Sequence, residues 1–363
     1  MWLRAVALAW PLSVGAHTGG AQWEAQQLAT TASFRGLSVV SERVVWASGT
    51  RGTVVRTTDG GRTWAVMAVP GADSLDFRDV EAFDARRAYV LSIGNGAASR
   101  IYKTIDGGAT WALQFTNADT AAFYDCFGFW SPERGMAVSD PVGGRFRVIA
   151  TSDGGGSWVE LPPDRIPPAI AGEAAFAASG TCLTVRAPDN VWIVSGGGRE
   201  ARVYRSATGG INWQVASTPI TTGAPARGIF SVAFADARRG VAVGGDYQAA
   251  TDTAANVALT DDGGVTWRLA AGRPGGYRSS VAYVPGSGGR VLVAVGTSGS
   301  EYSTDGGETW TPIDTAGFNT VAFAPGPNGI GWAVGPSGRI AKWAGPAPGT
   351  ESARRIRVRK DPP

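Results

Sequence analysis

The sequence predicts an all-β fold, a seven-bladed β-propeller built from four-stranded antiparallel blades. The first observation is a phrase of two central glycines and a final tryptophan, "TTDGGRTW" at 57–64, which returns five more times. The second is the spacing of these tryptophans, 47, 47, 55, 54 and 43 residues, which is the length of a blade. The third is the composition, with 52 Gly, 21 Pro and only 17% charged residues, which suits short strands joined by turns.

Each repeat predicts four consecutive strands, shown by the unit with expected strands at 77–83, 88–94, 100–106 and 110–115. Asp-Gly-Gly closes the hairpin between the third and fourth strands, because Asp caps the turn and glycine accepts positive φ. The tryptophan is expected to start the outer strand and to pack over its neighbours in the ring. These structural residues are Asp59, Trp64, Asp106, Trp111, Asp153, Trp158, Trp213, Asp262, Trp267, Asp305 and Trp310. The fourth repeat has Thr208 in place of the aspartate.

The seventh blade is predicted to contain segments from both ends of the folded body. Residues 318–345 supply three strands with no outer strand after them, whereas 22–28 match an outer strand in phase and begin at Trp23. We therefore expect 22–28 to complete the last blade, which leaves no unpaired edge. The predicted organisation is a signal peptide at 1–16, a propeller at 22–345 and a basic, disordered tail at 346–363.

The two ends of the sequence predict an exported chain, periplasmic or extracellular, that does not span a membrane. A short apolar run and small residues before His17 are typical of a signal peptide, with an N-terminal strand as the alternative. The tail at 351–363 holds five basic and two acidic residues, which leaves 28 of each in the rest of the chain. A neutral body argues against nucleic acid as partner, and the tail is either solvated or a contact for an acidic or anionic partner.

The two cysteines, Cys126 and Cys182, occupy a position in the repeat that is aliphatic in other units, which carry Leu37, Val80, Val232, Val281 and Val321 there. Cysteine buries readily as a small apolar residue. We therefore expect two core thiols, with a disulfide between blades as the alternative.

The repeated phrase resembles the Asp-box, also called the bacterial neuraminidase repeat. The phrases at 45–64 and 331–340 resemble more specifically the photosystem II stability and assembly factor family and its bacterial relatives. The resemblance covers about residues 22–345. It implies a seven-bladed, exported, non-enzymatic factor that holds part of a membrane protein during assembly, with arginines forming the contact patch. Asp-box propellers also include sialidases and other hydrolases, so the resemblance is stronger for fold than for function.

The residue types in the sequence limit which kinds of enzyme this chain could be. His17, the only histidine, lies at the expected cleavage site, so catalytic arrangements and metal sites that use histidine are not predicted. A sialidase-like arginine motif, Arg165-Ile166-Pro167, follows the third Asp-box instead of preceding the first. A hydrolase with two carboxylates across a groove remains the runner-up, and its candidates are Asp79, Asp125, Asp140 and Asp246. No metal is predicted, and no cofactor is predicted either, since the glycine-rich stretch 195–202 lacks the following helix that a dinucleotide site requires.

The candidate ligand-binding residues lie on the face opposite the Asp-box turns, where loops vary in length as binding loops do. Arginines recur there at the starts of first and third strands, and arginine grips carboxylates in a bidentate fork. The predicted set is Arg35, Arg78, Arg278, Arg51, Arg100, Arg145, Arg339, Tyr124, Asp79, Asp125 and Asn319. The alternative is that these arginines pair with neighbouring acids.

Together these observations predict an exported, non-catalytic protein-binding propeller, an assembly or stability factor for a membrane or envelope protein complex. Its expected partner is a protein or peptide segment, such as an acidic or C-terminal tail of a membrane protein. A glycoside hydrolase, sialidase-like or with a carboxylate pair, is the alternative.

Overall fold

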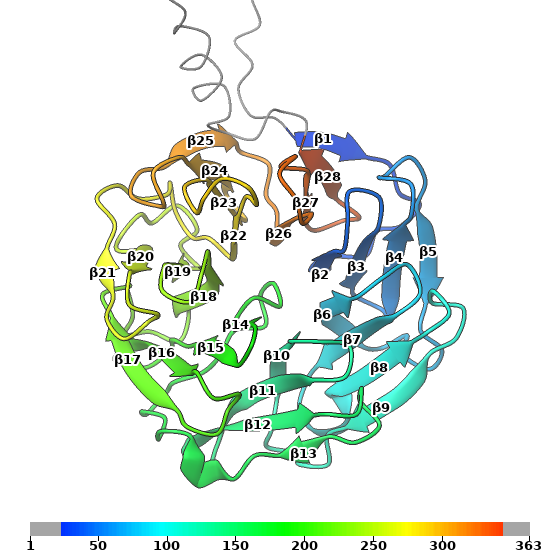
Figure 1. The fold of residues 1–363 in the computed structure, drawn as a ribbon, viewed down its shortest axis with the longest axis horizontal. Helices are drawn as coiled ribbons and strands as arrows, with labels where there is room; N and C mark the ends of the chain where they lie inside the picture. Colours follow the sequence, from blue (N-terminus) through cyan, green and yellow to red (C-terminus); the bar gives the residue numbers. More distant parts are fainter. Residues whose placement is uncertain (1–22, 344–363) are drawn as a thin grey trace, which may run out of the picture.

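The computed structural model describes residues 23–343 and shows seven antiparallel sheets arranged in a ring. Each sheet has four strands, and almost all regular structure is β, as predicted (Figure 1). The predicted signal peptide at 1–16 and the tail at 346–363 lie outside the described residues. No helix within 23–343 has the length and apolar character needed to cross a membrane.

The blades follow one another along the chain and are numbered here in that order. Blade 1 holds β2 (Phe34–Val39), β3 (Val45–Gly49), β4 (Thr53–Thr57) and β5 (Ala65–Ala68). Blade 2 holds β6 (Asp76–Ala82), β7 (Ala88–Ile93), β8 (Arg100–Thr104) and β9 (Ala112–Thr116). Blade 3 holds β10 (Tyr124–Phe129), β11 (Gly135–Val142), β12 (Arg145–Thr151) and β13 (Val159–Glu160). Blade 4 holds β14 (Leu183–Arg186), β15 (Asn190–Val194), β16 (Ala201–Ser206) and β17 (Gln214–Thr218).

The remaining three blades repeat the same order. Blade 5 holds β18 (Arg227–Phe234), β19 (Gly240–Asp246), β20 (Val257–Thr260) and β21 (Arg268–Leu269). Blade 6 holds β22 (Ser280–Tyr283), β23 (Leu292–Gly296), β24 (Gly299–Ser303) and β25 (Thr311–Asp314). Blade 7 holds β26 (Thr320–Phe323), β27 (Gly331–Val334), β28 (Ile340–Trp343) and β1 (Trp23–Gln26). Two short 3-10 turns, η1 (Gly96–Ala98) and η2 (Pro163–Arg165), lie in connections.

Strand β1 closes the ring by pairing antiparallel with β28, which confirms the predicted origin of the last strand. Trp23 lies opposite Trp343 and Glu24 opposite Lys342. The Trp23 ring also packs at 4.9 Å from the Trp343 ring and 5.4 Å from the Phe318 ring, measured between centroids. The outer strand of blade 7 is therefore held by apolar contacts as well as by the strand ladder.

The Asp-box hairpin is stabilised by a small hydrogen-bond network, which blade 2 shows in full. The Asp106 Oδ1 accepts from the Thr110 amide at 2.9 Å, and Oδ2 accepts from the Thr110 hydroxyl at 2.5 Å. The Thr104 hydroxyl accepts from the Gly108 amide at 2.8 Å. Gly107 and Gly108 have φ of 84° and 89°, which a side chain would disfavour. The bonds from Thr110 lower the pKa of Asp106 to about 2.

The Asp-box tryptophans lie one residue before the outer strands that they were predicted to start. Trp111 lies just before β9, because Asp106 still binds Thr110 and so holds the chain in the turn up to that point. Their rings pack across the gap between blades, as when Trp64 of blade 1 meets Trp332 of blade 7 edge-on at 5.5 Å. Most of them are half-buried, and only Trp213 reaches full burial.

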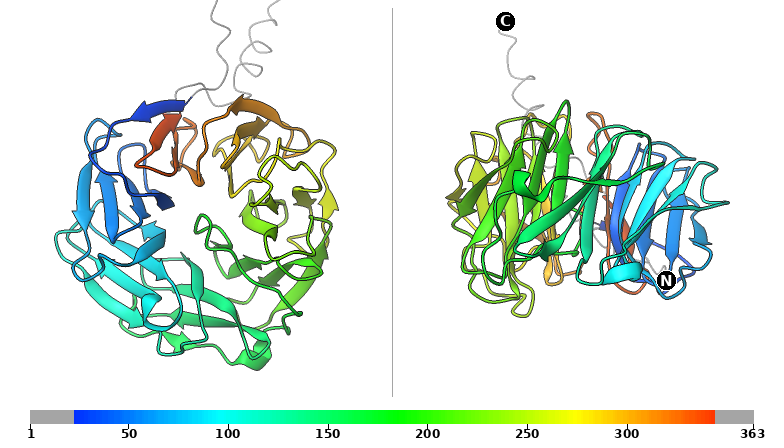
Figure 2. Two further views of the ribbon diagram at one scale, coloured as in Figure 1. Left: turned by 180° about the vertical axis from the view of Figure 1, so that it is seen from behind. Right: turned by 90° about the horizontal axis from the view of Figure 1, so that it is seen from below.

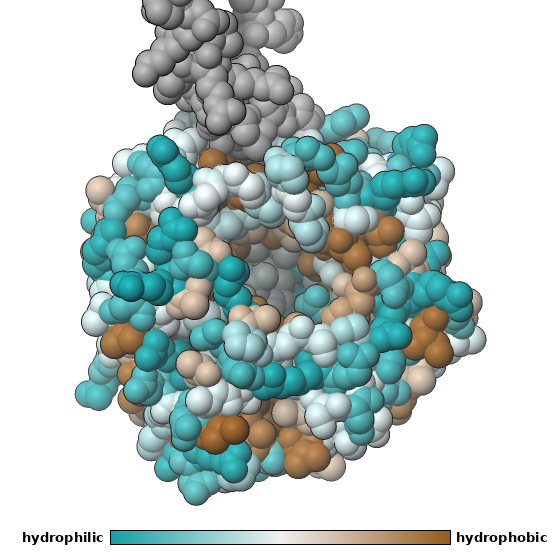
Figure 3. All heavy atoms as spheres, viewed as in Figure 1, coloured by the Kyte–Doolittle hydropathy of each residue, from teal (hydrophilic) through white to brown (hydrophobic). Residues whose placement is uncertain are grey.

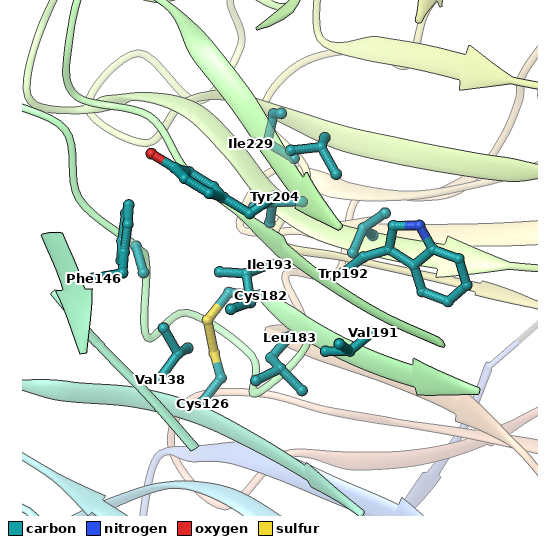
Figure 4. Close-up of a cluster of buried hydrophobic side chains, with 14 of the residues drawn as sticks. Cys126, Val138, Phe146, Cys182, Leu183, Val191, Trp192, Ile193, Tyr204 and Ile229 are labelled. Carbon is teal, nitrogen blue, oxygen red and sulfur yellow. A yellow bond between two sulfur atoms is a disulfide. The ribbon is translucent and has the colours of Figure 1, made fainter. Parts of the chain in front are cut away.

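The prediction of two free thiols is wrong, because Cys126 and Cys182 form a disulfide between blades 3 and 4 (Figure 4). Their Cα atoms are 6.1 Å apart, and both residues are fully buried. The position that they share lies at the innermost strands of adjacent blades, with Cys126 in β10 and Cys182 directly before β14, and there side chains meet across the interblade gap. Aligning the repeats identifies the position as apolar but does not show that neighbouring copies of it touch.

Candidate functional site

The face opposite the Asp-box turns, called the loop face here, carries the starts of the first and third strands of each blade. This follows from the topology, because the first and third strands run in the same direction and the third ends at the Asp-box. Figure 2 shows the ring from behind and from below, with the strands running between its two faces. Figure 3 shows that the ring is hollowed at its centre.

A segment of the chain itself crosses the central channel. The connection 161–182 joins β13 to β14, and part of it reaches into the middle of the ring (Figures 1 and 2). Residues 175–181, called the channel segment here, have no strand assignment, and Ala174 just before them forms an isolated antiparallel bridge with Gly196 of blade 4. Ala178 and Ser179 in its centre are buried.

Two of the predicted arginines hold the channel segment by its main chain. The Arg78 Nη1 donates to the Ala177 carbonyl at 2.9 Å, and the Arg35 Nη1 donates to the Ala178 carbonyl at 2.8 Å. Burial, and the nearby charge of Arg78, lower the pKa of Arg35. Arg78 is also paired with Asp76 at 2.7 Å. Both arginines therefore bind the main chain of a tight turn, in which the Ala178 amide donates to the Phe176 carbonyl at 2.7 Å.

The other blades complete the enclosure of the channel segment. The Ser179 hydroxyl donates to the Ser279 carbonyl at 2.7 Å, and Phe176 stacks on Phe230 at 3.9 Å between ring centroids. The Thr181 hydroxyl bonds with the Ser231 hydroxyl at 2.7 Å. With the bridge at Ala174, the contacts come from every blade: Arg35, Arg78, Asp140, Gly196, Ser231, Ser279 and Thr320.

Three acidic residues lie under the channel segment, and two of them were candidate ligand-binding residues. Asp79 bridges blades 2 and 3, because its Oδ1 accepts from the Val80 amide at 2.8 Å and its Oδ2 from the Phe127 amide at 2.9 Å. Burial raises the pKa of Asp79 well above its usual range. Gly180 of the channel segment, with φ of 74°, packs so closely that a Cβ there would overlap Asp79 Oδ1.

Asp125 and Asp140 form an adjacent acid pair. The Asp140 Oδ1 accepts from the Ala175 amide at 2.8 Å, and burial raises the pKa of Asp140 to about 6. Burial and the charge of Asp140 raise the pKa of Asp125 well above its usual range, although the nearby amides of Asp140 and Ala177 act in the opposite direction. Asp125 is only 2% exposed, and its Oδ2 has no hydrogen-bond partner among residues 23–343. The pair therefore lies beneath the channel segment and does not face an open groove.

Arg278, Asn319 and Tyr124 are placed inside the blades. Arg278 is 2% exposed and forms a bidentate pair with Glu301, with both N–O distances at 2.6 Å. The Asn319 side-chain amide donates to the Phe34 carbonyl at 2.8 Å, which joins blades 7 and 1. Tyr124 is buried with its ring centroid 5.3 Å from that of Phe115.

The arginines at the third strands lie at the loop face and bond to nearby loops. Arg51 donates to the Thr31 hydroxyl at 2.9 Å, and Arg100 donates to the Ala97 carbonyl at 2.6 Å. Arg145 donates to the Ile166 carbonyl, and Arg339 donates to the Gly317 carbonyl. Arg51 and Arg339 are exposed, so their remaining N–H donors face solvent.

The structure thus brings Arg35, Arg78, Asp79 and Asp125 together at the channel, and distributes the other candidates over the blades and the rim. Sequence reasoning missed the channel segment and its aromatic anchor Phe176. The signal available was the unusual length of the connection between the third and fourth repeats. No cluster of three or more His, Cys, Asp or Glu side chains that could hold a metal ion occurs within the described part of the chain.

Comparisons with known proteins agree with the repeat and the ring. The BNR/Asp-box repeat model matches residues 301–312. Comparison with curated protein sequences found no match. Among solved structures, YCF48 bound to D1 peptide matches with a TM-score of 0.63 at 17% identity, covering 89% of this chain and 94% of that chain.

Two further structures show the same architecture. YCF48 from Cyanidioschyzon merolae has a TM-score of 0.63 at 19% identity, covering 88% of this chain and 98% of that chain. The WD40 propeller domain of Doa1 has a TM-score of 0.57 at 10% identity, covering 89% and 97%. At these identities the likeness concerns the fold. The chain is therefore a seven-bladed propeller with Asp-box repeats, and it is similar in fold to the photosystem II assembly factor YCF48.

Proposed function

We propose that this chain is an exported, non-catalytic propeller that binds a protein segment on its loop face and assists the assembly or stability of a membrane or envelope protein complex. The observation that carries the proposal is the way Arg35 and Arg78 donate to two consecutive main-chain carbonyls of the channel segment. This is the chemistry by which a protein surface holds a peptide.

The fold comparison supports the same function, since YCF48 of similar fold has been seen with a D1 peptide. The exposed Arg51 and Arg339 on the loop face have donors in solvent that suit an acidic or C-terminal tail of a membrane protein. The disulfide Cys126–Cys182 supports export, because disulfides persist mainly in oxidising compartments.

The geometry favours binding over the hydrolase alternative. Hydrolysis of a glycoside by two carboxylates requires that both reach the substrate from opposite sides of a groove. Asp125 and Asp140 are adjacent, but Asp125 is buried beneath the channel segment and its pKa is raised.

The proposal is tested by capture from an envelope extract with purified native chain and two variants. The loop-face variant is Arg51→Ala/Arg339→Ala, and the matched control on the Asp-box face is Arg62→Ala/Arg238→Ala, since all four side chains are exposed. We expect a membrane protein to be captured by the native chain and the control, and lost with the loop-face variant. Equal capture by both variants, or hydrolysis of a glycan panel by the native chain, would contradict the proposal.

A further inference from the structure

The channel segment is held mostly by groups that do not depend on its side chains. Ala175, Ala177 and Ala178 contribute an amide or a carbonyl to Asp140, Arg78 and Arg35. Their methyl groups bury little area, so the segment contributes little hydrophobic free energy of its own. Any peptide that adopts the same turn could present the same amide and carbonyl groups to this ring of side chains.

Besides the hydroxyl bonds of Ser179 and Thr181, two features of the channel segment depend on residue type. Phe176 stacks on Phe230 with an interplanar angle of 15°, and Phe230 meets Tyr277 edge-on at 4.7 Å, which makes an aromatic pocket at the channel mouth. Gly180 lies against the Asp79 carboxylate with positive φ, so only glycine fits there without displacement. The site therefore selects an aromatic residue followed, four positions later, by glycine, with small residues between them.

One group of the site is left unsatisfied by the resident segment. The Asp125 Oδ2 is buried without a partner in residues 23–343, although the same carboxyl group lies beside the Ala177 amide. A buried polar atom without a partner costs free energy that a better-matched occupant recovers. The methyl group of Ala177 offers no donor, whereas Ser or Asn at this position would.

We propose that residues 175–181 occupy, from within the same chain, a binding site for a turned peptide segment, and that a partner segment with the pattern aromatic, three small residues and glycine displaces them. This inference rests on the proposed function and adds the site and the sequence class of the partner. The resident segment then acts as an intramolecular competitor. A partner binds at the channel only after the segment has left it.

The test uses a labelled synthetic peptide with the sequence of residues 174–181 and the full chain, with binding followed by fluorescence anisotropy. Phe176→Ala weakens the resident segment but leaves every group of the site in place. Phe83→Ala is the matched control, because Phe83 packs in a half-buried aromatic cluster with Tyr89 and Phe129, outside the channel. We expect Phe176→Ala to bind the peptide at least about tenfold more tightly than the native chain, which corresponds to about 1.4 kcal/mol. We expect the control to equal the native chain.

Further arms make the result specific. Adding Arg78→Ala to Phe176→Ala should abolish binding, and a peptide with Ser in place of Ala177 should bind more tightly than the original. If Phe176→Ala fails to fold, hydrogen exchange on the native chain replaces it. Saturating peptide should then accelerate exchange of the amides of 175–181. Unchanged exchange, or equal gains in peptide binding by Phe176→Ala and Phe83→Ala, overturns the inference. Capture that depends on Arg51 and Arg339 would still uphold the proposed function in that case.

Discussion

Replacing both cysteines by valine removes the covalent link between blades 3 and 4 and introduces the residue that Val80 and Val232 supply at the same position in other blades. Cys126 and Cys182 are separated by 56 residues. In the chain-entropy treatment, a link across a loop of that length stabilises the folded state by about 4 kcal/mol at 25 °C, by restricting the unfolded chain. We therefore expect the double valine variant to lose about 4 kcal/mol of unfolding free energy.

Urea unfolding followed by tryptophan fluorescence measures this loss, with the native chain kept oxidised. A double alanine variant is the comparison, because it breaks the same link but leaves more empty space. In both variants the unfolding free energy should also fall more steeply with urea concentration, since an unlinked unfolded chain exposes more surface. The reasoning is refuted if the valine variant lies within about 1 kcal/mol of the native chain, because the link would then restrict an unfolded state that is already compact.

Three further predictions concern single sites. Arg278→Ala should lower the unfolding free energy measured in urea by about 3–5 kcal/mol, because it leaves Glu301 buried and unpaired. The double variant Arg278→Met/Glu301→Leu should recover most of this loss. Equal losses in the two variants would contradict a role for the ion pair. Thr208→Asp should raise the unfolding free energy by about 1 kcal/mol. Thr208 offers the Asn212 amide one acceptor at 2.9 Å, whereas the aspartate of the other Asp-boxes supplies two oxygens. An unchanged thermal midpoint would contradict this prediction. The pKa of Asp106 is lowered to about 2, so its stabilisation is complete above its unfolded pKa near 4 and disappears as the pH falls through 2. The difference in urea midpoint between native chain and Asp106→Asn should therefore shrink from pH 5 to pH 2, and a constant difference would contradict the assignment.

The ring could be predicted from the sequence because its determinants are local and repeated. An Asp-box contains the hydrogen-bond partners of its own turn, as Asp106 and Thr110 show, so each copy reports its own structure. The closure of the last blade by the strand that begins at Trp23 could also be inferred, because the last blade lacks an outer strand and the N-terminal segment is a surplus outer strand of the same phase.

The channel could not be predicted in the same way, because its contacts join parts of the chain that share no period. The phase of the repeat placed Arg35 and Arg78 near the axis, but it gave no sign that a connection would return to the axis and occupy their donors. For the same reason the sequence did not show that Arg278 is buried in an ion pair, because its partner Glu301 lies two strands away in its own blade. The position of a residue within a repeat predicts where its Cα lies in the ring, but it does not predict which residues its side chain contacts.

The free-energy balance at the channel sets what a partner must provide. A segment tethered at both ends competes at an effective concentration on the order of millimolar, so a partner present at micromolar concentration must bind the emptied site about 10³-fold more tightly than the resident does. The main-chain bonds to Arg35 and Arg78 cannot supply this difference, because both occupants make them equally. It must come from contacts that the resident lacks, and the unpaired Asp125 Oδ2 is such a position within the described residues. A hydrogen bond from the partner to Asp125, worth about 0.5–1.5 kcal/mol, supplies up to about tenfold of the required factor. The rest must come from contacts outside the channel, such as those of Arg51 and Arg339 with an acidic tail, so a partner needs both parts to bind.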